Sequence, residues 1–84
     1  VGAHGRTPLM IAASEGLEEA FEILVGKGAK VTTTGDRRMT PLHEASANGH
    51  TRIAARLIEL GANVNAQTQD GITPLMCAAA WGYI

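Results

Sequence analysis

Apolar side chains in this chain recur at helical spacing in short blocks, and each block begins in the same way. In the first block, Leu9, Ala12 and Ala13 fall at positions i, i+3 and i+4, which is the spacing of one buried face of a helix. Thr7-Pro8 precedes them, and a threonine before a proline is typical of a helix N-cap followed by the first helical residue. The pattern therefore predicts a short helix that begins at Pro8.

The same block recurs with a fixed period. Thr-Pro-Leu begins at Thr7, Thr40 and Thr73, so that both intervals are 33 residues. Self-similarity with a period of roughly 20 to 50 residues indicates a stack of supersecondary units rather than one closed core. We divide the 84 residues into units 1–33, 34–66 and 67–84, of which the last is shortened. Each unit also has a glycine nine residues after its threonine, which predicts the end of the first helix at Gly16, Gly49 and Gly82.

A second amphipathic stretch follows the first helix of each complete unit. The apolar positions that we expect to face inward are Leu17, Ala20, Phe21 and Leu24 in the first unit and Ile53, Leu57 and Ile58 in the second. The segments that follow combine β-branched residues with the turn dipeptides Gly35-Asp36 and Asp70-Gly71. Each unit is thus predicted as helix, turn, helix and a projecting hairpin-like loop, and the fold class as an all-α repeat solenoid.

Residues 40–45, Thr-Pro-Leu-His-Glu-Ala, and residues 61–66, Gly-Ala-Asn-Val-Asn-Ala, resemble the ankyrin repeat, as does Gly49-His50. The resemblance covers the whole chain. It implies antiparallel helix pairs that stack side by side, with loops that project nearly at right angles. It also implies a concave surface, formed by the loop tips and the first helices, that usually binds other proteins. Because neither end carries a polar capping repeat, we expect further ankyrin repeats of the same parent chain on one or both sides.

Two positions depart from the pattern of this family. Met10 and Met76 stand where the family most often has histidine, so we expect the hydrogen bonds of that histidine only around His43. Arg37-Arg38 stands where the other units have His4-Gly5 and Asp70-Gly71. A turn at Arg38 would need a backbone conformation that is unfavourable without glycine, so we expect the chain to turn at Gly35-Asp36 instead. The loop of the second unit should then look unlike its neighbour.

Composition and charge exclude several classes of function. The net charge of −1 supplies no basic field for nucleic acid, and no apolar run approaches the ~20 residues that a membrane span requires. The acidic residues of the first unit and the arginines of the second are expected to meet across the units as exposed pairs. The single cysteine, Cys77, permits no intramolecular disulfide, and an intracellular location, cytoplasmic or nuclear, is expected.

No motif indicates catalysis. His43-Glu44 begins like the zinc motif His-Glu-x-x-His, but Ala47 stands where the second histidine should be. The segment 26–28, Gly-Lys-Gly, lacks the glycine spacing and the hydroxyl residue of a phosphate-binding loop. Cys77 has no base or cation nearby in sequence that would activate its thiol. We therefore expect no enzyme activity, no cofactor and no metal.

The outer face of the first helices is identified by subtraction. If Leu9 and its equivalents pack inward, the residues that point outward are Ile11, Ser14 and Glu15 in the first unit, Glu44, Ala47 and Asn48 in the second, and Cys77, Ala80 and Trp81 in the third. Trp81 is the leading candidate for partner contact because tryptophan is enriched among binding hot spots. The alternative is that Trp81 packs against Tyr83 or a further repeat.

The loops supply the other candidate contacts. The residue before each threonine lies at the base of a loop, and Met39 and Ile72 could extend an apolar patch from Trp81, although partial burial under the loops is the alternative. We predict a non-catalytic module that binds a partner protein; a structural spacer within a longer array is the rival interpretation. The full set of candidate contacts is Trp81, Met39, Ile72, Arg6, Asp36, Arg37, Glu44, Asn48 and Gln69.

Overall fold

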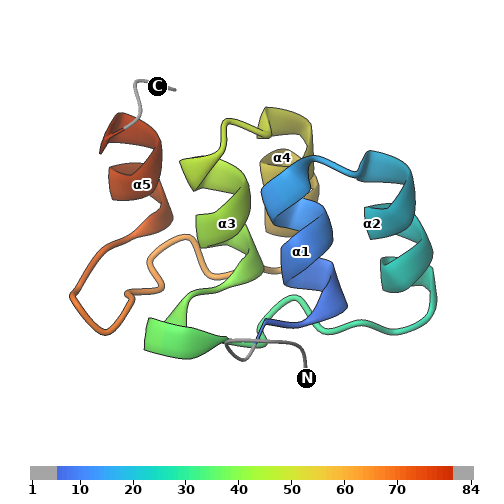
Figure 1. Ribbon diagram of the computed structural model, residues 1–84, viewed down its shortest axis with the longest axis horizontal. Coiled ribbons are helices and arrows are strands. Elements are labelled where there is room, and N and C mark those ends of the chain that lie inside the picture. Colours follow the sequence, from blue (N-terminus) through green and yellow to red (C-terminus); the bar gives the residue numbers. More distant parts are fainter. Residues whose placement is uncertain (1–5, 81–84) are drawn as a thin grey trace.

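The computed structural model describes residues 6–80. The helices are α1 (Pro8–Glu15), α2 (Glu18–Gly26), α3 (Pro41–Ala47), α4 (Thr51–Glu59) and α5 (Pro74–Ala80), with one turn of 3-10 helix, η2 (Asp36–Arg38). The helices α1, α3 and α5 stand side by side, α2 lies beside α1, and α4 packs behind α3 (Figure 1). The long segments that follow α2 and α4 run along one edge of the molecule, at the bottom of Figure 1. Residues 6–80 contain no β-strand, which confirms an all-α repeat solenoid.

The helix starts follow from the repeated Thr-Pro dipeptide. The hydroxyls of Thr7, Thr40 and Thr73 each accept a hydrogen bond from the backbone N–H three residues later, at 3.2, 3.2 and 3.3 Å. Each of these bonds satisfies an amide that the helix itself leaves unpaired. The predicted helix starts at Pro8, Pro41 and Pro74 are therefore confirmed. Gly16 and Gly49 follow the ends of α1 and α3 in the left-handed conformation, with φ of 73° and 75°, as predicted. Gly82 lies outside the described residues.

The core is continuous across the first two units. Its buried members are Leu9, Ala12, Ala13, Phe21, Leu42, Ala45, Ile53 and Leu57.

Two of the predictions of inward-facing residues are wrong. Leu17 is 46% exposed because it precedes the first residue of α2, and Ile58 is 48% exposed because no described residue covers its side of α4. The charges meet across the units as expected: Arg56 Nε lies 2.9 Å from Glu22 Oε2.

One contact between the first and second units lies at the turns that follow α1 and α3. The ring of His50 lies over Gly16, and a Cβ atom added at Gly16 would stand only 2.6 Å from His50 Cε1. The Nε2–H of His50 donates to the backbone oxygen of Ser14 at 3.0 Å. The glycine that ends α1 therefore serves two purposes, since it adopts the left-handed conformation and leaves room for the imidazole of the next unit.

The loop of the second unit contradicts the expected position of its turn. Arg37 and Arg38 both have left-handed backbone conformations, with φ of 59° and 62°, and Gly35 is extended. The bonds Gly35 N–Met39 O (2.8 Å) and Arg38 N–Gly35 O (3.1 Å) have exact counterparts one unit later, in Thr68 N–Ile72 O (2.9 Å) and Gly71 N–Thr68 O (2.9 Å). The two loops are thus closed alike, and the turn does not move to Gly35-Asp36. These bonds hold the arginines in a conformation that costs non-glycine residues about 1–2 kcal/mol each.

Candidate protein-interaction surface

The outward residues of α1 and α3 form one continuous surface. The side-chain amide of Asn48 donates to Ser14 Oγ at 3.3 Å and to the backbone oxygen of Glu44 at 2.9 Å. Ile11, Glu15 and Asn48 are exposed, as the helical spacing predicted. We use the name interaction face for this surface and its continuation onto α5, with the members Ile11, Ser14, Glu15, Glu44, Ala47, Asn48 and Cys77.

Arg6 and Glu44 contact each other in this surface. Arg6 Nε lies 3.3 Å from Glu44 Oε2, and the Glu44 side chain is largely buried. The two charges attract, but the contact lacks hydrogen-bond geometry, and Arg6 Nε is buried without a hydrogen bond. The sequence suggested two independent partner contacts at these positions. The structure instead brings the Arg6 guanidinium and the Glu44 carboxylate together as one pair.

Cys77 lies beside the same carboxylate. Burial, and secondarily the charge of Glu44, raise the pKa of the Cys77 thiol above its ordinary value. Both effects disfavour the thiolate, which is the reactive form. This supports the prediction of an inert thiol.

The tips of the two loops that adjoin the interaction face are joined by a backbone hydrogen bond. The backbone N–H of Gln69 donates to the backbone oxygen of Arg37 at 2.7 Å. Arg37 also lies 4.0 Å from Asp70, in a highly exposed pair that salt screens readily. Asp36 is exposed at the start of η2. The loop candidates are therefore held at fixed spacing by a backbone bond.

Met39 and Ile72 differ in exposure. Met39 is partly buried, as the alternative of partial burial under the loops expects, whereas Ile72 is exposed. Trp81, the leading candidate from the sequence, lies outside the described residues. The interaction face is therefore defined by its other members.

His43 joins the start of α3 to the segment that precedes α5. Its side chain is fully buried, and its Nδ1 accepts from the backbone N–H of Thr40 at 3.2 Å and lies 2.8 Å from the Thr40 hydroxyl. Its Nε2 lies 2.7 Å from the backbone oxygen of Ile72, and because a carbonyl can only accept, Nε2 carries the proton. The bonds to Thr40 confirm the prediction for His43.

The sequence did not reveal the bond from His43 to Ile72. The signal was present in the repeat, because Ile72 directly precedes the threonine of the next unit. The bond uses the second ring nitrogen, so neither nitrogen of His43 is free for a metal. Among the described residues, no group of three or more His, Cys, Asp or Glu side chains is placed to hold a metal ion.

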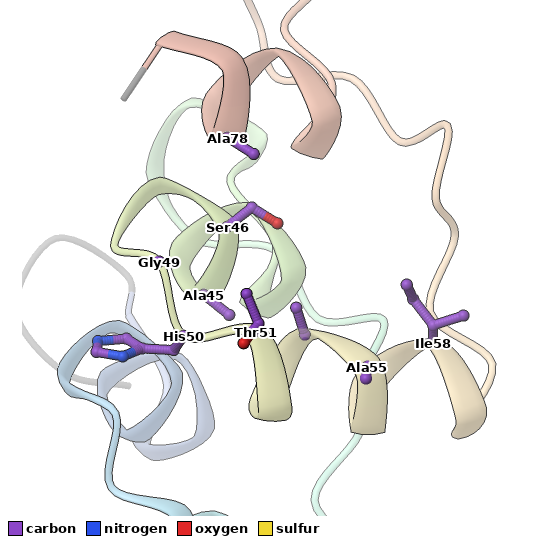
Figure 2. A pocket seen from close by; sticks show the side chains of 9 residues that line it. Ala45, Ser46, Gly49, His50, Thr51, Ala55, Ile58 and Ala78 are labelled. Carbon is purple, nitrogen blue, oxygen red and sulfur yellow. The ribbon is translucent and has the colours of Figure 1, made fainter. Parts of the chain in front are cut away.

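An apolar hollow opens on the other side of α3. Figure 2 shows Ser46 of α3, Ile58 of α4 and Ala78 of α5 around it, while the His50 ring turns away toward α1. The hollow has a volume of about 270 Å³, and its remaining lining residues are Ala45, Gly49, Thr51, Ala54 and Ala55. Apart from His50, whose Nε2–H bonds the Ser14 carbonyl, the polar side chains of the lining are two hydroxyls, so the hollow is mainly apolar.

The stacked helix pairs and their bonded loops define a repeat protein whose units share one surface. No helix within residues 6–80 is long and apolar enough to cross a membrane. The family model described as ankyrin repeats, in three copies, matches residues 9–84. The chain belongs to the ankyrin repeat family.

Individual relatives agree with this assignment. The chain is 39% identical to mouse Rabankyrin-5 over 79 residues, which is 92% of the chain and 7% of that protein. It is 42% identical over 72 residues to alpha-latrocrustotoxin-Lt1a of Latrodectus tredecimguttatus, covering 84% of the chain and 5% of the toxin. The crystal structure of the human ASB11 ankyrin repeat domain superposes with a TM-score of 0.90 at 40% identity, over 93% of this chain and 35% of that one.

The chain thus spans less than a tenth of the length of either curated relative. Ankyrin repeats generally mediate protein–protein binding and are generally non-catalytic, and no catalytic family is indicated for this chain.

Proposed function

We propose that this chain is a non-catalytic module that binds a partner protein on the interaction face, the concave side of the stack, together with the adjoining loop tips. The observation that carries the proposal is the hydrogen bond between Asn48 and Ser14, which joins the outward residues of neighbouring units into one surface. The proposed contacts are Arg6, Asp36, Arg37, Met39, Glu44, Asn48, Gln69 and Ile72, with Ile11 and Glu15 added from the structure and Trp81 retained from the sequence.

The chemistry of this face fits a mixed interface. Ile11 and Ile72 expose apolar surface, whereas Glu15, Asn48 and the Arg37–Asp70 pair expose polar groups. Protein interfaces usually combine apolar and polar contacts of this kind. The His43–Ile72 bond fixes the loop relative to α3 before a partner arrives, which lowers the ordering cost of binding.

The test is a selection of binders from a displayed peptide library with the folded chain as bait. Each selected binder is then measured against Ile11→Arg and Asn48→Arg, which place a bulky charge on the interaction face. The matched control is Ile23→Arg, because Ile23 is a highly exposed apolar residue on α2. The proposal expects binding to be lost with the first two variants and kept with the control, at unchanged helicity. Binders that lose affinity only with Ile23→Arg would contradict it.

A structural spacer within a longer array is the second candidate function. Ile58 and Leu75 are exposed apolar residues on the side of the hollow, where a further helix could pack, and the relatives are much longer proteins. In that case no library binder would depend on Ile11 or Asn48. Either function is compatible with the proposed intracellular setting, in which the lone Cys77 stays reduced.

A further inference from the structure

A polar depression lies between the loop that precedes α3 and the segment that precedes α5. Its volume is about 490 Å³. The residues that line it are Thr34, Arg38, Thr40, Asn63, Asn65, Ala66, Gln67, Thr68, Gln69 and Gly71. Of these, only Gln69 is also a proposed contact of the interaction face, and only Arg38 is charged. The depression is therefore a separate feature with a single cation in its wall.

Arg38 is unusual for its position. Its φ of 62° is the conformation that Gly71 adopts one unit later, at 80°, and the sequence has Gly5 one unit earlier. Glycine would close this turn without strain, so the arginine is not needed for the turn. Arg37 next to it pairs with Asp70, but no ion pair of the described residues includes Arg38. The exposed guanidinium of Arg38 thus has all its donors available.

The neutral groups around Arg38 also present donors. Asn63, which lines the depression, accepts with its Oδ1 from the backbone N–H of Asn65 at 2.9 Å, so its side-chain NH₂ can donate elsewhere. Thr68 is only 6% exposed, and its Oγ1 accepts from the backbone N–H groups of Asp70 (3.3 Å) and Ile72 (3.1 Å). The hydroxyl hydrogen of Thr68 has no acceptor among the described residues. The amides and hydroxyls of this wall can donate or accept, but its one charged group is a cation, and this combination suits an anion.

We propose that this depression binds a carboxylate carried by an aspartate or glutamate side chain of an extended partner peptide. Arg38 supplies the charge, and Asn63 and Thr68 supply neutral donors. Asp36 and Asp70 flank the depression without lining it, so that together with Arg37 and Arg38 the local charge sums to zero. Recognition therefore acts at hydrogen-bond range and not by long-range steering. Ile11 and Asn48 do not line the depression, so their variants are expected to leave this site intact.

The experiment is a titration of the folded, ¹⁵N-labelled chain with the peptide acetyl-Gly-Ser-Glu-Ser-Gly-amide, followed by amide chemical shifts. The same peptide with glutamine in place of glutamate is the neutral probe, and inorganic phosphate is the second anion. We expect the glutamate peptide to shift the amide signals of Arg38 and of residues 63–71, the glutamine peptide to shift them much less, and added salt to weaken the binding.

Two matched variants decide the role of Arg38. Arg38→Asn and Arg37→Asn each remove one positive charge from a left-handed position that asparagine tolerates, and only Arg38 lines the depression. We expect Arg38→Asn to raise the Kd of the glutamate peptide about fivefold, the upper range for an exposed charge pair, and Arg37→Asn to change it less than about twofold. Circular dichroism checks that both variants keep their helices.

Three results would overturn the proposal. The first is equal binding of the glutamine peptide, and the second is an equal effect of the two arginine variants. The third is binding of inorganic phosphate without binding of the glutamate peptide, which would assign the depression to a different anion.

Discussion

The same tripeptide, Thr-Pro-Leu, begins three helices, but its leucine is buried in two of them and exposed in the third. Leu9 and Leu42 are each 2% exposed, whereas Leu75 is 65% exposed and lines a shallow apolar hollow with Ile58 and Val64. The three threonine caps are nevertheless alike. The tripeptide therefore determines where a helix begins, but neighbouring units determine whether its leucine is buried. The expectation that all three leucines make buried contacts is wrong for Leu75.

The largest expected effect comes from truncating these leucines. Leu42→Ala removes a fully packed side chain between neighbouring units and should lower the free energy of unfolding by about 3 kcal/mol. Leu75→Ala should cost less than about 1 kcal/mol, because its side chain is already in contact with solvent. Urea denaturation followed by circular dichroism measures both. Equal losses would show that the motif, and not its neighbours, governs the contribution of the leucine.

The second prediction concerns the residue after each tripeptide. Met10 and His43 are both fully buried, but only His43 bonds the next unit, through Ile72. His43→Met would leave the Thr40 amide and the Ile72 carbonyl without their partner and should cost about 2 kcal/mol. Loss of amide protection at Thr40, measured by hydrogen exchange, identifies the cause. A variant as stable as the original chain would mean that water or the methionine replaces these bonds at no cost.

The third prediction compares the two loops, which are closed by the same bonds. Arg38→Gly relieves a left-handed arginine but adds freedom to the unfolded chain, so the net gain should be about 0.5 kcal/mol. The reverse change, Gly71→Arg, should cost a similar amount. Thermal unfolding of both variants provides the measurement. A destabilised Arg38→Gly would show that the Arg38 side chain makes a contact that outweighs its backbone strain.

The smallest expected effect concerns the rate at which the Cys77 thiol reacts. Ile11, Glu44 and Cys77 occupy the same position in successive units, and Glu44 helps to raise the pKa of Cys77. A raised pKa means less thiolate at pH 8, so Cys77 should react with iodoacetamide more slowly in the folded chain than in urea. Glu44→Gln removes the repelling charge and should accelerate the folded-state reaction roughly twofold. An unchanged rate would leave burial as the sole cause.

The sequence predicted the features that follow from local spacing along one helix. The caps at Thr7, Thr40 and Thr73 and the buried stripe of α1 follow from spacing alone, and the structure confirms them. The errors have different sources. Ile58 looks buried on a helical face, but its exposure depends on what packs against α4, whereas the conformation of Arg38 depends on backbone bonds inside its own loop, which the residue pattern does not report.

The sequence predicted less of the candidate surface than of the fold. Helical spacing gives the outward direction of Ile11 and Asn48, but not the partners that these faces find within the chain. The Arg6–Glu44 contact and the bond between the Arg37 and Gln69 backbones join residues about 30 or more positions apart. A pattern read along one chain does not report such pairs, because each depends on how closely two units approach.

The bond from His43 to Ile72 has a mechanical consequence. It lies at the loop edge of the stack, as does the bond between Gln69 and Arg37, so the second and third units are fastened on the same side. A force that stretches the array should therefore rotate one unit relative to the next about this edge before it separates them. Stretching would then first bend the joint between these two units, before either unit unfolds.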